Sequence, residues 1–360
     1  MIQRTATSLE AQSLEAQSRE IRSMEDGRGP ASPLTWQQEL ARAINRPEAL
    51  LSELGLPPDL LPGARAGATL FSVRVPYPYL ARITYGDPDD PLLRQVLPLG
   101  AETLERPGFV DDPLKEADHT PQQGLIRKYH SRALLMVTGT CAINCRYCFR
   151  RHFPYADHRQ SPDARAAALE TLRDSPEINE VIFSGGDPLA VNDRLLAAWA
   201  EDLAAIPHLK RLRIHTRLPV VIPQRIDDAF IKWFGNNRLQ KVMVVHINHP
   251  REIDDAVHRA MARLRDAGVT LLNQSVILKG VNDSVDTLRE LSESLFDAGI
   301  LPYYLHAFDP VQGAAHFDVS DEQARALMRG LLAMLPGFLV PRLVREIPGE
   351  SSKTPLTIQD

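Results

Sequence analysis

Three cysteines lie close together in the middle of the chain, as Cys141, Cys145 and Cys148, and the chain contains no others. Three cysteines cannot all pair as disulfides, whereas the Cys-x3-Cys-x2-Cys spacing brings three thiols into one loop. Thiolates are soft ligands that suit zinc or an iron–sulfur cluster. A zinc site needs a fourth ligand, which His152 or His158 could supply, while three thiolates on a four-iron cluster leave one iron open. The spacing therefore indicates a metal centre.

A glycine turn follows the next apolar segment of the chain. It consists of Ser184, Gly185, Gly186, Asp187 and Pro188. Backbone without side chains can approach a ligand closely, although these residue types also make ordinary turns between a strand and a helix. His246 and Gln274 lie near the ends of two later apolar segments. Taken singly, such side chains more often only satisfy hydrogen bonds inside the fold.

Six short apolar segments predict the strands that position these side chains. They cover residues 132–139, 180–186, 212–217, 242–248, 270–278 and 302–308. Helical periodicity occupies residues 164–174, 193–206, 252–268 and 284–299 between them. Strand–helix units in series predict an α/β fold with a parallel sheet whose functional residues lie at the C-terminal ends of the strands. Periodicity alone leaves two arrangements open, an open (β/α)6 barrel and a doubly wound sheet.

The regions outside this core differ in composition. Residues 1–33 are polar, contain a short SLEAQ repeat and predict a flexible leader. Residues 34–125 predict a helical region, residues 126–310 the α/β core, and residues 311–360 a C-terminal segment. The end of this segment is rich in proline, glycine and serine and is too irregular to be simply another helix.

Charge and hydropathy exclude several functional classes. The 41 Lys and Arg residues against 46 Asp and Glu give a net charge of -5, which provides no basic field for nucleic-acid binding. No run of eighteen apolar residues predicts a membrane span, and the first residues lack the apolar stretch of a secretory signal. We therefore expect a cytoplasmic protein that binds neither nucleic acid nor membranes.

The cysteine spacing, with Tyr147 directly before the last cysteine, resembles the signature of the radical S-adenosylmethionine enzymes. The glycine turn stands where that superfamily keeps a Gly-Gly-Glu-Pro-like turn. The resemblance implies an open (β/α)6 partial TIM barrel and a [4Fe-4S] cluster on the three cysteines. It also implies that S-adenosylmethionine contacts Ser184, Gly185, Gly186, Asp187, His246 and Gln274.

From about residue 35 to the C-terminus the chain resembles the lysine 2,3-aminomutases, and among them the bacterial aminomutases of the elongation factor P β-lysylation pathway. The runs that carry this resemblance are CRYCFRRHFPYA, FSGGDPL, LLNQSV, LPYYLH, VQGAAHF and SKTPL. It implies that Lys353 binds pyridoxal 5′-phosphate covalently, with Tyr129 and Arg132 as further contacts. Taken alone, Lys353 in such a tail would be a solvated charge. Gly-Glu-Ser-Ser precedes it where clostridial aminomutases have a run of glycines, so the loop is expected to be less flexible.

The same resemblance implies contacts to a lysine substrate. Arg150 matches the anchor of the α-carboxylate, which a guanidinium binds through two parallel hydrogen bonds. Asp309 and Glu346 match the acids that hold the ε-ammonium group, although Glu346 replaces an aspartate and reaches one methylene further. The additional C-terminal cysteines that bind zinc in clostridial members are absent, and no zinc is expected.

The expected function is the conversion of L-lysine to β-lysine, as the R isomer, for attachment to elongation factor P by a lysyl ligase. A flavodoxin or ferredoxin would supply electrons, and a homo-oligomer is possible. Two alternatives stay open, a stand-alone aminomutase that makes free β-lysine and a non-catalytic zinc-binding module.

Overall fold

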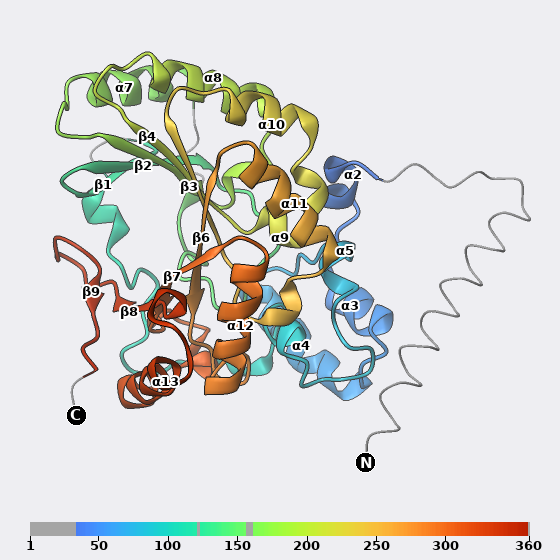
Figure 1. The fold of residues 1–360 in the computed structure, drawn as a ribbon. Helices are drawn as coiled ribbons and strands as arrows, with labels where there is room; N and C mark the ends of the chain where they lie inside the picture. Colours follow the sequence, from blue (N-terminus) through green and yellow to red (C-terminus); the bar gives the residue numbers. More distant parts are fainter. Residues whose placement is uncertain (1–33, 121–122, 156–160, 359–360) are drawn as a thin grey trace, which may run out of the picture. The chain divides into compact units, whose positions relative to one another are not determined.

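The computed structural model describes residues 34–120, 123–155 and 161–358, and Figure 1 shows its ribbon. The leader predicted for residues 1–33 lies outside these ranges. The described residues from Trp36 onward form one compact unit. No helix in the described ranges is long and apolar enough to cross a membrane.

One sheet organises this unit, and its nine strands follow one another in chain order. They are β1 (Leu125–Tyr129), β2 (Arg132–Thr138), β3 (Glu180–Gly185), β4 (Arg211–Thr216), β5 (Gln240–Val245), β6 (Thr270–Val276), β7 (Leu301–His306), β8 (Arg342–Arg345) and β9 (Thr354–Pro355). Strands β2 to β8 are parallel, while β1 and β9 add antiparallel edges. Among the described strands β1 and β9 do not pair, so the sheet stays open. The prediction of six parallel strands is confirmed as β2 to β7.

The strand order decides between the two arrangements that the sequence left open. A doubly wound sheet reverses its strand order at a switch point. Here the order runs from β1 to β9 without reversal, so the partial barrel is correct and the doubly wound sheet is wrong. Consecutive helices also contact each other, α8 with α10 and α10 with α11, as in a singly wound barrel.

In the described ranges, a series of longer helices covers the outer face of the sheet (Figure 1). They are α7 (Pro162–Arg173), α8 (Asp193–Ala204), α10 (Asp228–Gly235), α11 (Asp255–Asp266), α12 (Val285–Asp297) and α13 (Asp321–Met334). Each begins after a capping side chain that accepts a backbone N–H: Ser161, Asn192, Asp227, Asp254, Ser284 or Ser320. These caps satisfy donors that the first helical turn leaves without partners.

Short helices precede the sheet and share its core. They are α2 (Trp36–Ala41), α3 (Pro47–Glu53), α4 (Leu61–Leu70), α5 (Tyr77–Leu80) and α6 (Pro91–Arg94). Leu50 and Leu92 from this region are buried in the same apolar cluster as Val181 and Ile214 from the strands. Burial of these side chains joins the two parts at roughly 1.5–3 kcal/mol for each large apolar side chain.

The C-terminal segment contains a small hairpin that the sequence did not predict. β8 pairs with β7 in parallel, and β9 then pairs with β8 in antiparallel orientation, with Arg345 opposite Thr354. Gly349 in the connection has a φ of 86°, which glycine adopts without strain. The pairing places Glu346, directly after β8, beside Lys353, directly before β9.

Candidate active site

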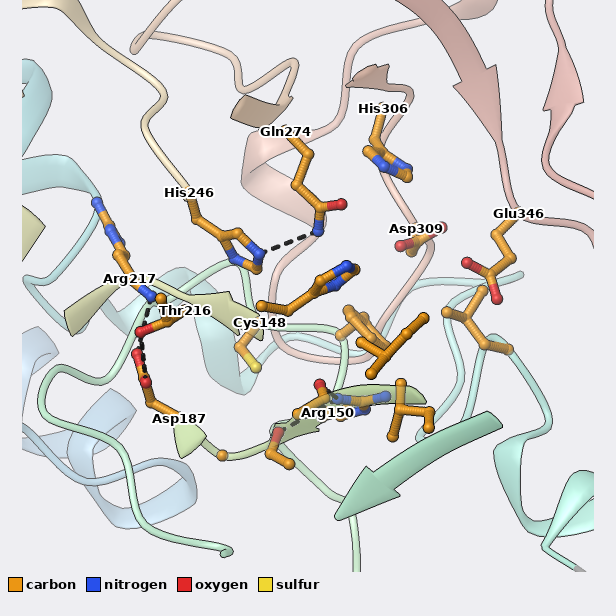
Figure 2. Close-up of a pocket in the computed structure, with 18 of the residues that line it drawn as sticks. Cys148, Arg150, Asp187, Thr216, Arg217, His246, Gln274, His306, Asp309 and Glu346 are labelled. Carbon is orange, nitrogen blue, oxygen red and sulfur yellow. Dashed lines mark hydrogen bonds between the residues drawn. The ribbon is translucent and has the colours of Figure 1, made fainter. Parts of the chain in front are cut away.

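One cavity of about 430 Å3 lies on the inner face of the sheet, and Figure 2 shows side chains around it. Every residue that the sequence singled out as a site residue lines this cavity: Cys141, Cys145, Cys148, Ser184, Gly185, Gly186, Asp187, His246, Gln274, Tyr129, Arg132, Arg150, Asp309, Glu346 and Lys353. In Figure 2, Cys148 and Asp187 lie on one side of the cavity, and Asp309 and Glu346 on the other.

The cavity extends along the strands and not only over their C-terminal ends. On β3 the alternate residues Glu180, Ile182 and Ser184 line it, because successive side chains of a strand point to opposite faces. Arg132, expected near pyridoxal phosphate, begins β2, whereas the cysteines follow the end of β2. The rule that functional residues lie at the C-terminal strand ends therefore locates only one part of this site.

The three cysteines lie in the irregular segment after β2, and each is partly buried. Burial raises the pKa of Cys141 well above its ordinary value. Burial and the neighbouring Cys145 raise the pKa of Cys148 to about 11. Because a metal binds the thiolate form, a cluster on these cysteines would bind with release of protons.

The zinc alternative finds no fourth ligand among the described residues. The Nε2 atom of His152 lies 3.0 Å from the carbonyl oxygen of Gln312, and His158 lies outside the described ranges. In the part of the chain that the structure describes, no three His, Cys, Asp or Glu side chains converge as one metal ion requires. A four-iron cluster has a different geometry, because each cysteine binds a different iron atom. The donor set therefore fits a cluster.

Buried ion pairs attach the cysteine segment to the N-terminal helices. Glu102 binds both Arg146 and Arg151, and all three side chains are fully buried. The two guanidinium groups also stack on the ring of Phe71, each 5.0 Å from its centroid. Two buried cations around one acid fix the backbone on both sides of Cys148.

The two glycines of the turn make room for the cysteine segment. A Cβ atom on Gly185 would lie 2.2 Å from the carbonyl oxygen of Thr138, and one on Gly186 would lie 2.6 Å from that of Thr140. The backbone N–H of Gly186 also donates to the Thr138 carbonyl at 2.7 Å. The turn is therefore more than an ordinary connection, because its backbone packs directly against the segment that carries the cysteines.

Asp187 connects the turn to the end of β4. Its carboxylate accepts hydrogen bonds from the Thr216 hydroxyl at 2.6 Å and from the backbone N–H groups of Leu189, Arg217 and Leu218. These donors occupy both carboxylate oxygens, as the dashed lines of Figure 2 show in part. Both oxygens of the Asp187 carboxylate are therefore already hydrogen-bonded to donors of the protein itself.

Three histidines line the cavity in their neutral form. Burial, followed by the charge of Arg217, lowers the pKa of His246 to about 3, and its Nε2 atom lies 3.0 Å from the Gln274 amide nitrogen (Figure 2). Burial also lowers the pKa of His215 and His306 well below the ordinary value. The Nε2 atoms of His215 and His306 are buried and have no hydrogen-bond partner among the described residues.

His215 and His306 were not predicted as site residues. Only their positions in the sequence could have identified them. His215 lies in the segment LRIHTR of β4, and His306 is the last residue of β7. A buried imidazole nitrogen without a partner costs free energy unless a ligand bonds to it. These two atoms therefore fit a cavity that is built for polar cofactors.

The residues expected around pyridoxal phosphate meet at one end of the cavity. The Nζ atom of Lys353 lies 2.7 Å from Glu346 Oε2. The guanidinium of Arg132 stacks 4.2 Å from the centre of the Tyr129 ring, and no acid in the described ranges forms an ion pair with it. An unpaired guanidinium beside a lysine amine suits a phosphorylated aldehyde.

Arg150 is already bonded to an acid of the chain. Its Nε and Nη2 atoms donate to the two carboxylate oxygens of Glu116 at 2.6 and 2.8 Å, and Nη1 donates to the hydroxyl of Ser184 at 3.0 Å. Glu116 comes from η3 (Glu116–His119), is buried, and was not predicted as a site residue. It occupies the edge of the guanidinium that would bind a substrate carboxylate in the predicted manner.

A chain of alternating charges crosses the cavity from Arg150 to Lys353. Glu116 also contacts Lys128, whose Nζ atom lies 3.4 Å from Glu116 and 2.9 Å from Glu346. Glu346 then pairs with Lys353. The cations Lys353 and Lys128 more than offset burial and lower the pKa of Glu346. Each charged group in this series of side chains therefore has a partner within the protein.

Asp309 stands apart from that chain of charges. It is partly buried, and no ion pair to its carboxyl occurs in the described ranges. Burial, and then the charge of Glu346, raise its pKa to about 7. Near neutral pH, Asp309 is therefore close to its midpoint of ionisation, and a cation beside it would drive it to the charged form.

Comparison with known proteins gives a family to this geometry. Residues 135–291 match the Radical SAM superfamily. An L-lysine 2,3-aminomutase of Escherichia coli is 53% identical over 326 residues, which are 90% of this chain and 95% of the relative. One from Haemophilus influenzae is 50% identical over 319 residues, 89% of this chain and 94% of the relative. One from Clostridium subterminale is 36% identical over 327 residues, 89% of this chain and 77% of the relative.

Proposed function

Because this chain belongs to the family of L-lysine 2,3-aminomutases, we propose that it converts L-lysine to β-lysine with a [4Fe-4S] cluster, S-adenosylmethionine and pyridoxal phosphate. The observation that carries the proposal is the single cavity that joins three cysteines, the glycine turn and Lys353. A radical initiator and a lysine-bound carbonyl cofactor must share one chamber for both to act on one substrate.

The cluster supplies an electron for the radical chemistry of S-adenosylmethionine, and pyridoxal phosphate supplies a conjugated ring that spreads the unpaired spin. The chain supplies binding and exclusion of water. Cys141, Cys145 and Cys148 would hold the cluster. The backbone of the turn and the neutral pair His246 and Gln274 would face S-adenosylmethionine, while Asp187 keeps the turn in place through its bonds to the end of β4.

Lys353 would provide the amine that binds pyridoxal phosphate, and Arg132 would provide the positive charge that binds its phosphate. The amine must first leave Glu346, which lies 2.7 Å away. A lysine substrate brings an ammonium group of its own, which takes the place of Lys353 beside Glu346. The reach of glutamate suits this exchange, since the same carboxylate serves first one amine and then the other.

The two ends of the substrate go to opposite ends of the cavity. Arg150 binds the α-carboxylate, and Asp309 with Glu346 binds the ε-ammonium group. Because Glu116 holds Arg150 through two hydrogen bonds, the incoming carboxylate exchanges with Glu116, which keeps Lys128 as a partner. This exchange selects a substrate that carries both a carboxylate and a distant amine.

We further infer that the β-lysine serves elongation factor P through a lysyl ligase. The resemblance to the aminomutases of that pathway supports this role. The length of the chain supports the comparison with the Escherichia coli relative, because the chain covers 95% of that relative but 77% of the clostridial one. A flavodoxin or ferredoxin would supply electrons, and the cytoplasm, where thiols stay reduced, would be the compartment. An unchanged mass of elongation factor P in a deletion strain would leave free β-lysine as the product instead.

Anaerobic incubation with L-lysine, S-adenosylmethionine, pyridoxal phosphate and a reductant tests the activity. Chromatography should separate newly formed β-lysine from α-lysine. Lys353→Ala should lose the pyridoxal absorbance band and the product while keeping its iron, and Cys145→Ser should lose cleavage of S-adenosylmethionine. Absence of β-lysine from fully loaded wild-type protein would refute the proposed reaction.

A further inference from the structure

Arg217, the residue directly after β4, touches one of the three cysteines. Its Nη1 atom donates a hydrogen bond to the Sγ atom of Cys145 at 2.8 Å. The side chain is 4% exposed. In the described ranges it is the one side-chain cation hydrogen-bonded to a cysteine sulfur. The predicted strand 212–217 ended at this arginine, and nothing in the sequence set it apart.

Other contacts of Arg217 fix its orientation. The Nη2 atom donates to Glu252 Oε2 at 2.8 Å and to the Gln95 side-chain oxygen at 2.7 Å. The guanidinium also lies over the rings of Tyr79 and Tyr147, 5.4 and 5.6 Å from their centroids. Because Glu252 and Gln95 bind Nη2 and the two tyrosine rings pack against the guanidinium plane, Nη1 stays directed at the sulfur of Cys145.

The acid that holds Arg217 is itself held firmly. Glu252 is fully buried, and its other oxygen accepts the backbone N–H of Asn248 at 3.0 Å and the Gln95 amide at 3.2 Å. These bonds come from the chain after β5 and from the N-terminal helical region. The donor to Cys145 therefore rests on three separate parts of the fold.

The same residue joins the cysteine to the glycine turn. The backbone N–H of Arg217 donates to Asp187 at 2.8 Å, while its side chain reaches Cys145. Any shift of the end of β4 would move both contacts. The position of Cys145 is thus set through the side chain of a residue that directly follows β4.

We propose that Arg217 is a positioning residue that orients Cys145 and raises the reduction potential of the cluster bound there. Reduction adds one electron, and therefore one negative charge, to the cluster and its sulfur ligands. A hydrogen bond and a buried positive charge at a ligand sulfur stabilise the more negative state. The cluster accepts its electron more readily as a result. This inference rests on the cluster and is independent of the amino acid substrate.

Redox titration of the reconstituted protein tests this role without substrate or S-adenosylmethionine. The [4Fe-4S]2+ cluster takes one electron from dithionite to become [4Fe-4S]+, and electron paramagnetic resonance measures the reduced fraction at each potential. Arg217→Gln removes the charge and the donor, so its midpoint should become more negative. Arg217→Lys keeps the positive charge but has one ammonium group in place of Nη1 and Nη2. Its midpoint should lie between those of the wild-type protein and Arg217→Gln.

Two further variants separate this effect from general damage. Glu252→Gln removes the negative partner of Arg217 and should move the midpoint in the opposite direction, toward less negative values. Arg225→Gln removes an equally buried arginine, which pairs with Asp193 at 2.7 Å away from the cysteines, and should leave the midpoint unchanged.

An unchanged midpoint in Arg217→Gln protein with full iron content would overturn the proposal. If that variant fails to bind iron, Arg217→Lys and Glu252→Gln decide, because opposite shifts support the proposal and equal or absent shifts reject it. Failure of the wild-type protein to form β-lysine would refute the proposed reaction but not this role of Arg217, which the midpoint of Arg217→Gln tests by itself.

Discussion

At the scale of single residues, Glu116 changes how Arg150, the proposed anchor of the substrate carboxylate, is understood. Both oxygens of Glu116 bind one edge of the guanidinium, as a substrate carboxylate would. Hydrogen bonds to charged groups contribute about 1.5–3 kcal/mol. A substrate that displaces such a bond binds correspondingly less tightly than the open anchor would allow.

Replacement of Glu116 by glutamine should therefore lower the KM for lysine, by about tenfold, because a neutral amide leaves the guanidinium edge more readily. Steady-state kinetics of the loaded enzyme measures this change. As a control, 1,5-diaminopentane lacks the carboxylate, and its inhibition constant should stay the same. Glu177→Gln, which alters the Arg127 ion pair away from the cavity, should leave the KM unchanged. A higher KM for Glu116→Gln would mean that Glu116 orients Arg150 and does not compete with the substrate.

The raised pKa of Asp309 predicts that kcat/KM depends on pH, because Asp309 is proposed to bind the ε-ammonium group of lysine. Its pKa is raised to about 7 by burial first and by Glu346 second, so the carboxyl is neutral below that pH and charged above it. A neutral carboxyl cannot attract an ammonium group, and kcat/KM should rise as the pH increases through about 7. This ratio reports the free enzyme. Asp309→Asn should lack that limb of the profile, and a variant with an unchanged limb would assign it to another group.

At the scale of elements, the glycine turn after β3 should be sensitive to a single methyl group. Gly185 has a φ of 126°, and a Cβ atom there would lie 2.2 Å from the Thr138 carbonyl oxygen. Alanine at this position should destabilise the fold by about 1–3 kcal/mol and displace the turn. Calorimetry should show a lower Tm, and equilibrium dialysis weaker binding of S-adenosylmethionine.

Gly337 provides the matched control, since a Cβ atom there meets nothing within 4 Å. Gly337→Ala should keep both the Tm and the affinity. Equal effects of the two substitutions would show that the turn after β3 has no special packing requirement.

Local sequence patterns predicted the strands but not the contacts between distant residues. The segments of β2 to β7 were recognisable because apolar side chains and turn residues follow one another directly. β9 has two residues and exists only through its bonds to β8, so no local pattern marks it. Glu116 and Arg150 are 34 residues apart, and Arg217 and Cys145 are 72 residues apart. Only the fold reveals such partners.

At the scale of the whole molecule, Glu102 connects the N-terminal helices to the cysteine segment. Its replacement by glutamine would leave Arg146 and Arg151 buried without a negative partner. Breaking a buried pair costs about 3–5 kcal/mol. Urea unfolding should show this loss, and reconstitution should give less iron per chain.

Glu293→Gln is the control for a surface pair, because Glu293 and Arg289 form an exposed contact at 2.9 Å. Exposed pairs contribute about 0.3–0.5 kcal/mol, so this variant should remain near wild type. If Glu102→Gln is equally stable, the ion pairs of Glu102 do not contribute to the attachment of the N-terminal helices.

The chain of charges from Arg150 to Lys353 also bears on how the enzyme responds to ionic strength. Mobile ions screen charges that face water over a length of about 8–10 Å, and they screen partly buried pairs much less. The side chains of Arg150, Lys128, Glu346 and Lys353 are only 9–19% exposed. In the proposed binding mode, lysine exchanges one partner for another and leaves the number of ion pairs nearly constant. The KM for lysine should therefore stay nearly flat from dilute buffer to high salt, and a steep rise with salt would show that the pairs open to solvent before the substrate arrives.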